Sequence, residues 1–103
     1  MIPRLLDDNI IQCLSNKWRY SYYRTTAQAE LDLVLEGPRR AVFAVEIKRS
    51  IAPRATKGFH LASEDIGATR KFVVYSGHET FPLAHDTEAI GLGAFLAEIH
   101  RAA

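Results

Sequence analysis

The chain has 103 residues, 48% hydrophobic and 24% charged, which is enough for one globular domain and too short for two. Thirteen Lys and Arg residues against twelve Asp and Glu residues leave a net charge of +1, which by itself favours no class of partner. The single cysteine excludes an internal disulfide, and no apolar run approaches the roughly 18 residues that cross a bilayer, so we expect one cytoplasmic domain over residues 1–103 with no membrane segment.

The first half of the chain predicts one helix followed by three strands. Apolar residues recur at helical intervals before Asn16, which is typical of an amphipathic helix of about three turns. The aromatic, alternating string at residues 18–25 favours a strand, and further strands are expected over residues 31–36 and 41–50. A Gly-Pro pair between the last two is typical of a turn. These three successive strands predict an antiparallel meander.

The second half predicts a helix, two strands and a closing helix. Residues 57–65 have a helical pattern that Gly67 ends, and the apolar segment 71–76 predicts a central strand. A short edge strand is expected over residues 88–92, and the last ten residues have the apolar stripe of a helix. We expect the strand after the middle helix to lie parallel to the third strand. The fold class is thus α/β, with a mixed central sheet flanked by helices in the order α-β-β-β-α-β-β-α.

Charged side chains interrupt two of these apolar strands. The two-residue period of a strand places Asp32 on one face and the neighbouring leucines at 31, 33 and 35 on the other. Glu46 and Lys48 share one face of the next strand, within the apolar run AVFAVEIK. Charged residues are rarely tolerated in such a run unless they are paired or bound to a metal. The pattern therefore predicts a site.

The chemistry of these residues suggests a divalent cation. If the two strands form a hairpin, Asp32 and Glu46 lie near each other across the ladder, and their repulsion calls for a cation. Hard oxygen ligands suit Mg²⁺ or Mn²⁺, with Glu30 as a third candidate ligand because it shares the strand parity of Asp32. Lys48 would orient water or stabilise charge on a phosphate. We therefore take Asp32, Glu46 and Lys48 as the candidate catalytic set.

The stretch from Arg24 to Ser50 resembles the core signature of the PD-(D/E)XK nuclease-like superfamily. The resemblance rests on Asp32, the step of fourteen residues to Glu46, and the string Glu-Ile-Lys that ends at Lys48. The YYRT string before it, a Lys-Gly pair before the middle helix and the closing pattern FPL…EAIGLGAFLAEI resemble, more narrowly, the C-terminal nuclease-like domain of a family of prokaryotic AAA-type ATPases. The likeness extends from about Trp18 to Ile99.

This resemblance implies a restriction-endonuclease-like fold, Mg²⁺ as the usual cofactor and DNA as the substrate. It also implies an acid on the first helix, for which the chain offers only Asp7 and Asp8. No glycine-rich phosphate loop occurs, so ATP hydrolysis is not expected of this chain, which would be a C-terminal fragment or a stand-alone remnant of a longer AAA-type ATPase. A homodimer is left open.

Nucleic-acid contacts are expected in the first half of the chain. Up to Lys57 the net charge is +4, and beyond it −3. Arg49, Ser50 and Lys57 are the candidate contacts to phosphate. Two alternatives stay open: a non-catalytic module that holds a protein or nucleic acid, with a purely structural ion pair between Glu46 and Lys48, and a truncated piece without a function of its own.

Overall fold

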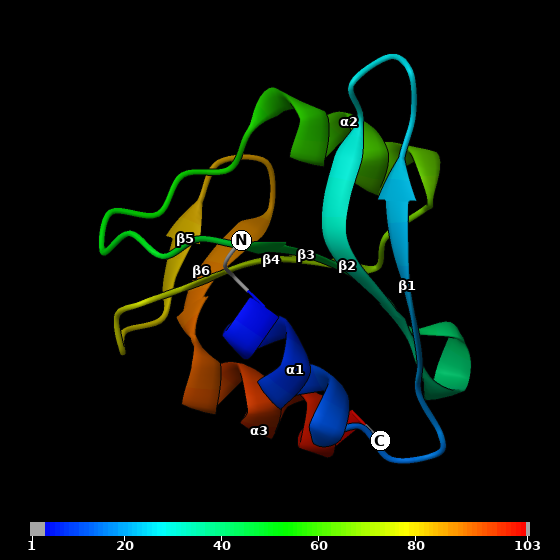
Figure 1. Ribbon diagram of the computed structural model, residues 1–103, viewed down its shortest axis with the longest axis vertical. Helices are drawn as coiled ribbons and strands as arrows, with labels where there is room; N and C mark the ends of the chain where they lie inside the picture. The colour runs from blue at the N-terminus through cyan, green and yellow to red at the C-terminus, as the bar shows by residue number, and fades with distance from the viewer. Residues whose placement is uncertain (1–3, 103) are drawn as a thin grey trace.

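The computed structural model describes residues 4–102, with side chains from Asp8 onward (Figure 1). It contains three helices and six strands, with a short 3₁₀ turn at Pro38–Arg40. In chain order the elements are α1 (Arg4–Gln12), β1 (Arg19–Arg24), β2 (Glu30–Glu36), β3 (Val42–Ile47), α2 (Lys57–Asp65), β4 (Arg70–Tyr75), β5 (Phe81–Leu83), β6 (Thr87–Gly91) and α3 (Leu92–Ala102).

The strands form one mixed sheet in the order β1-β2-β3-β4-β6-β5. β1, β2 and β3 are antiparallel neighbours, which confirms the predicted meander, and β4 lies parallel to β3, as predicted for strands joined by a crossover. β6, on the other side of β4, is also parallel to it. The mixed α/β class with helices flanking a central sheet is thus correct. β3 ends at Ile47, so Lys48, Arg49 and Ser50 lie in the following loop and not on the strand that we expected.

The predicted order of elements is wrong near the C-terminus. Three strands, and not two, lie between α2 and α3, because Phe81–Leu83 forms the additional strand β5. β5 pairs antiparallel with β6 and forms the sheet edge, so β6 is an inner strand. A three-residue strand with a central proline carries almost no periodic signal, and proline is tolerated at an edge because no neighbour needs its missing N–H.

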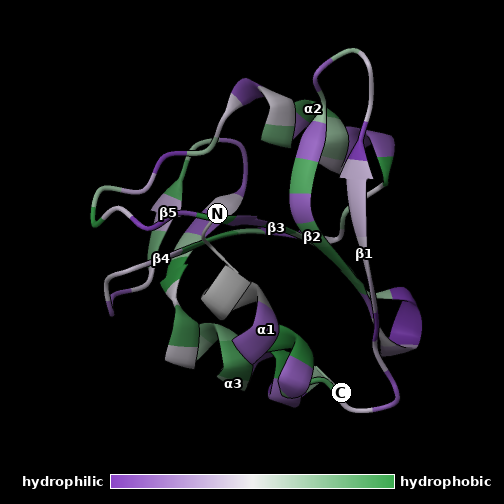
Figure 2. Cartoon of the chain, in the orientation of Figure 1, coloured by the Kyte–Doolittle hydropathy of each residue, from purple (hydrophilic) through white to green (hydrophobic). Residues whose placement is uncertain are grey.

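The helices cover both faces of the sheet (Figure 1). α1 and α3 pack on one face, where Ile10, Phe95 and Ile99 join a core built from β2, β3, β4 and β6. α2 packs on the other face through Phe59 and Ala62. Figure 2 shows hydrophobic residues along β4, inside the sheet, and a more hydrophilic β1 at its edge. None of the helices among residues 4–102 is long and apolar enough to cross a membrane.

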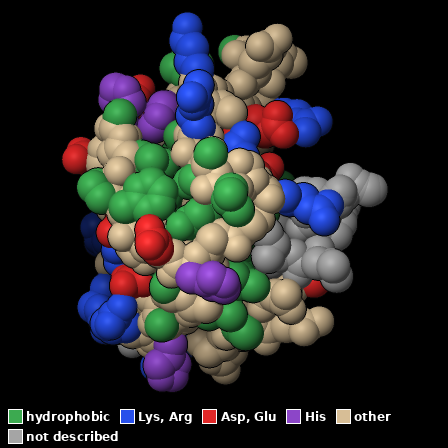
Figure 3. Space-filling view, turned by 90° about the vertical axis from the view of Figure 1, so that its left-hand side faces the viewer, with side chains coloured by type: hydrophobic (Ala, Val, Ile, Leu, Met, Phe, Trp, Pro, Cys, Tyr) green, Lys and Arg blue, Asp and Glu red, His purple; other side chains and the backbone are tan. Residues whose placement is uncertain are grey.

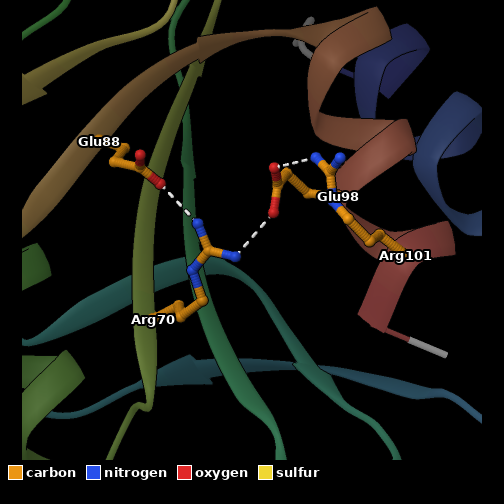
Figure 4. A network of polar contacts seen from close by, with 4 residues as sticks. All are labelled: Arg70, Glu88, Glu98 and Arg101. Carbon is orange, nitrogen blue, oxygen red and sulfur yellow. Dashed lines mark hydrogen bonds and ion pairs between the residues drawn. The ribbon is translucent and has the colours of Figure 1, made fainter.

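The α1–α3 face also contains a charged cluster around Arg70, at the start of β4 (Figure 4). Its guanidinium donates to Glu88 on β6 and to Glu98 on α3, each at 2.7 Å. Its Cζ lies 4.7 Å from the ring centroid of Phe72. Glu98 also accepts a hydrogen bond from Arg101. The cluster ties α3 to two inner strands.

Candidate functional site

A β-bulge in β2 determines the position of Asp32. Ser21 of β1 pairs with Val34 and Tyr23 pairs with Leu31, so β2 has one residue more than β1 across this interval. Such an extra residue bends the strand and changes where its side chains point. Leu31 and Val34 consequently pack on the α2 face, whereas Leu33 packs on the α1–α3 face. The expectation that the three leucines share one face is therefore wrong.

β2 and β3 separate immediately beyond this bulge. Their pairing runs from Glu36 and Val42 to Leu33 and Val45 and stops there. Next to this end, Asp32 Oδ2 accepts a hydrogen bond from the backbone N–H of Ile47 at 2.7 Å. If the β2–β3 pairing continued, the N–H of Ile47 would bond to a backbone carbonyl of β2. Here the Asp32 carboxylate takes the place of that carbonyl. The hydrogen bond fixes the Asp32 carboxylate beside the end of β3.

Glu46 lies in the buried part of β3 with only 8% of its surface exposed. Its Oε2 is 3.1 Å from Lys48 Nζ, and its Oε1 accepts from the backbone N–H of Thr56 at 3.2 Å. Thr56 is also the N-cap of α2, where its hydroxyl accepts from the N–H of Phe59 at 3.0 Å. The start of α2 therefore holds one oxygen of Glu46 while Lys48 neutralises the other.

A cavity of about 620 Å³ opens between the β1–β2 turn and the start of α2. It is lined by Arg24, Thr25, Gln28, Glu30, Asp32, Glu46, Thr56 and Gly58. The structure thus brings two of the three predicted catalytic residues to one cavity, and it places the third, Lys48, in contact with Glu46. Arg49, Ser50 and Lys57 are exposed and do not line this cavity.

The surroundings of Asp32 oppose its ionisation. Burial raises the pKa of its carboxyl above the usual 3.8, and the negative charges of Glu46 and Glu30 raise it further. The hydrogen bond from the N–H of Ile47 and the charge of Lys48 act in the opposite direction without cancelling these effects. A cation between Asp32 and Glu46 would remove this repulsion and favour the charged carboxylate.

Asp32 and Glu46 suit Mg²⁺, which keeps several water ligands, better than a metal ion that takes all its ligands from the protein. Among the side chains that the structure describes, residues 8–102, no group of three or more His, Cys, Asp and Glu is placed to hold a metal ion. Glu30 lines the cavity, but its carboxylate accepts from Arg24 at 2.9 Å. Mg²⁺ retains several waters and often binds through one or two carboxylates together with substrate phosphates. Asp32 and Glu46 fit that kind of site.

The part of the first helix whose side chains are described contributes no acid to the cavity. α1 packs on the opposite face of the sheet from α2, whereas Glu46 and Thr56 lie on the α2 side (Figure 1). Asp8 is exposed on α1 and does not line the cavity, and the side chain of Asp7 lies outside the described residues. The acid that the superfamily resemblance implies on this helix therefore has no counterpart in the described part of α1.

Sequence reasoning missed the roles of Thr56 and Gly58. Threonine before a helical pattern is a recognisable N-cap signal, but nothing local indicates that its N–H reaches Glu46. Gly58 lies where a Cβ would be 2.5 Å from the carbonyl oxygen of Gln28. Glycine at this position allows the β1–β2 turn to approach α2 and close one side of the cavity.

Gly58→Ala is therefore expected to destabilise the domain by about 2 kcal/mol, in the range of overpacked core substitutions. Alanine is the better helix former, so the loss would come from the contact with the backbone of Gln28. Urea unfolding measures the effect. Gly93→Ala is the matched control, since a Cβ there meets no atom within 4 Å, and this variant should be slightly stabilised. Equal stability of the two variants would contradict the close approach.

Comparison with known proteins gives one family. Residues 9–95 match the family described as "Domain of unknown function (DUF4143)". The chain belongs to this family. No curated protein and no solved structure matches the chain. Because the DUF4143 match extends from α1 into α3, it includes every residue that lines the cavity.

Proposed function

We propose that this DUF4143 domain is a Mg²⁺- or Mn²⁺-dependent phosphodiesterase that acts on DNA, with a restriction-endonuclease-like arrangement of its sheet. The observation that carries the proposal is the position of Asp32 and Glu46 at one cavity, with Lys48 Nζ 3.1 Å from Glu46. The resemblance to PD-(D/E)XK nucleases at these same positions supports it. A location in the cytoplasm is part of the proposal.

Asp32 and Glu46 would hold the ion, which when bound supplies a Lewis acid for the phosphate and acidifies water. The protein's own groups prepare the site. The N–H of Ile47 fixes the Asp32 carboxylate, and the N–H of Thr56 fixes Glu46. Lys48 is half-buried next to Glu46, where its ammonium would stabilise the charge that gathers on the scissile phosphate.

Lys48→Met is expected to lower the cleavage rate by about 100-fold, because the variant lacks the ammonium that stabilises the transition state. The assay uses plasmid and single-stranded DNA with Mg²⁺, Mn²⁺ or EDTA. Lys17→Met removes a charge from an exposed position away from the cavity and should retain the wild-type rate. Cleavage that persists in Lys48→Met or in EDTA would identify a contaminating nuclease and refute the proposal.

A non-catalytic module is the second candidate function. The observation that favours it is the pairing of Glu46 with Lys48 and Thr56, which satisfies this buried carboxylate without a metal. Calorimetric titration with Mg²⁺ separates the two functions. Absence of binding at millimolar Mg²⁺, with the fold intact, would favour a module that holds DNA or a protein, such as an AAA-type ATPase domain or a second copy of the chain.

A further inference from the structure

All the charged residues in the loop between β3 and α2 and in the first two turns of α2 are basic. Residues 48–63 contain Lys48, Arg49, Arg54 and Lys57 and no Asp or Glu. Arg49, Arg54 and Lys57 are exposed, and none of them forms an ion pair with a side chain among residues 8–102. Two cations on this loop and one at the first residue of α2, without acids between them, are complementary to a polyanion.

Ile51 projects from this loop with 81% of its surface exposed. It is the most exposed of the large hydrophobic residues in the described part of the chain, compared with 42% for Leu61 on α2. An isolated exposed apolar residue is ordinary on a protein surface. Ile51 differs because it lies between two unpaired arginines, on the segment that joins Glu46 to Thr56.

Hydrogen bonds fix the first part of this loop, residues 48–52. The Ser76 hydroxyl donates to the carbonyl of Arg49 at 2.5 Å, and the N–H of Ala52 donates to the Ser50 hydroxyl at 2.8 Å. The N–H of Lys48 bonds to the carbonyl of Val74 at 2.8 Å. Residues on either side of Ile51 are therefore fixed to each other or to the end of β4. A preorganised loop loses little conformational entropy when it binds.

The loop borders the cavity. It leaves the end of β3 next to Glu46 and enters α2 at Thr56, which lines the cavity (Figure 1, green segment at the left). Figure 3 views the molecule from this side and shows Lys and Arg side chains on its upper part, close to Asp and Glu side chains. A polyanion bound along the loop would pass beside the acid pair.

We propose that residues 49–57 bind duplex DNA through the minor groove and insert Ile51 between two base pairs. Arg49, Arg54 and Lys57 contact phosphates on both sides of the inserted residue. Apolar wedges such as isoleucine partly unstack a base step and kink the duplex, which brings more backbone against the protein. A branched aliphatic side chain cannot stack flat on a base as an aromatic ring does, so insertion at a duplex step, and not stacking on a single strand, is the mode proposed for Ile51. This inference rests on the proposed DNA substrate and adds how the duplex is positioned.

The test uses a duplex with 2-aminopurine, whose fluorescence rises when its base unstacks, and the Asp32→Asn variant with Mg²⁺ to prevent cleavage. Binding should raise the fluorescence, and Ile51→Ala in that background should abolish the rise and weaken binding about fivefold to tenfold. Leu61→Ala is the matched control and should retain both. Arg54→Gln should reduce the slope of log affinity against log salt by about 1, as expected for one lost phosphate contact.

The outcomes separate this inference from the proposed function. An Ile51-dependent fluorescence rise without any cleavage by the wild-type protein would support the inserted wedge and refute the nuclease. Cleavage by the wild-type protein, with the same fluorescence rise in Ile51→Ala, would refute the wedge and leave the nuclease in place. Tighter binding to single strands than to duplexes would also refute the wedge. If no DNA binds, both proposals are wrong.

Discussion

Asp32→Asn is expected to abolish Mg²⁺-dependent DNA cleavage and at the same time to stabilise the folded domain. The substitution removes a carboxylate that would hold the ion, and we expect a loss of activity of at least about 100-fold. The gain in stability has a separate cause. Burial and the neighbouring acids raise the pKa of Asp32, so its ionisation disfavours the folded state. Asparagine is uncharged and can still accept from Ile47.

The stabilisation should depend on pH. The folded protein binds the Asp32 proton more tightly than the unfolded chain does, so wild-type stability falls as pH rises from about 3.8 through the raised pKa. Asn does not titrate. The advantage of Asp32→Asn is therefore largest at pH 7 to 8 and shrinks as the pH approaches 4. Melting temperatures across this range measure it without a metal.

Mg²⁺ tests whether the unfavourable charge of Asp32 causes this pH-dependent difference in stability. The ion should raise the melting temperature of the wild-type protein and leave that of Asp32→Asn unchanged, since binding to the folded state alone stabilises it. Glu36→Gln removes an exposed acid at the other end of β2 and should change neither the activity nor the response to Mg²⁺. A destabilised Asp32→Asn that still cleaves DNA would contradict both expectations.

Arg70→Met is expected to destabilise the domain by about 2 kcal/mol at pH 7. The substitution leaves Glu88 and Glu98 without their shared cation and removes the guanidinium that lies over Phe72. Partly exposed ion pairs contribute less than buried ones, and a cation–π contact adds about 0.5–1 kcal/mol, which gives this intermediate value. For a domain of this size the melting temperature should fall by about 10 °C.

The loss should diminish in acid. Hydrogen bonding to Arg70 holds the pKa of Glu98 below its usual 4.5, so this pairing stabilises the fold above that pH and is lost as pH falls through the lowered pKa. Urea unfolding at pH 7 and pH 3 should show a large and then a smaller difference from the wild type. Arg101→Met removes only the exposed partner of Glu98 and should cost about 0.5 kcal/mol. If Arg70→Met lowers the free energy of unfolding equally at pH 7 and pH 3, the ion pair between Arg70 and Glu98 does not account for the loss.

The sequence was sufficient to predict the elements that have strong periodic patterns. The helix at residues 57–65 has the predicted bounds, because Gly67 adopts a φ of +65° that ends it. The meander and the parallel β4 followed from long apolar runs separated by turn residues. The bulge in β2 was not predictable, because it depends on how β1 pairs with β2 and leaves no mark in an alternating sequence. β5 (Phe81–Leu83) was too short to show a periodic pattern in the sequence.

The candidate site could be predicted only in part, for a related reason. Asp32, Glu46 and Lys48 were proposed because charged residues within apolar runs are costly, and this cost is visible locally, although Lys48 lies just beyond the end of β3. The contacts of Thr56 and Gly58 with the site arise from packing between elements, which no short pattern encodes. The parity argument placed Asp32 on the correct side, although Leu31 lies on the face opposite to the one that regular alternation assigns to it.

The residues that line the cavity all come from a continuous stretch between positions 24 and 58, and β4, β5, β6 and α3 contribute none. If the proposed function is correct, the later half of the chain supports the site from a distance, through the stability of the sheet and through the hydrogen bonds of Val74 and Ser76 to the loop at Lys48 and Arg49. Substitutions there can accumulate during evolution as long as the sheet persists, whereas changes within the earlier stretch act directly on reactivity. Mutational tolerance should therefore differ sharply between the two halves of this small domain.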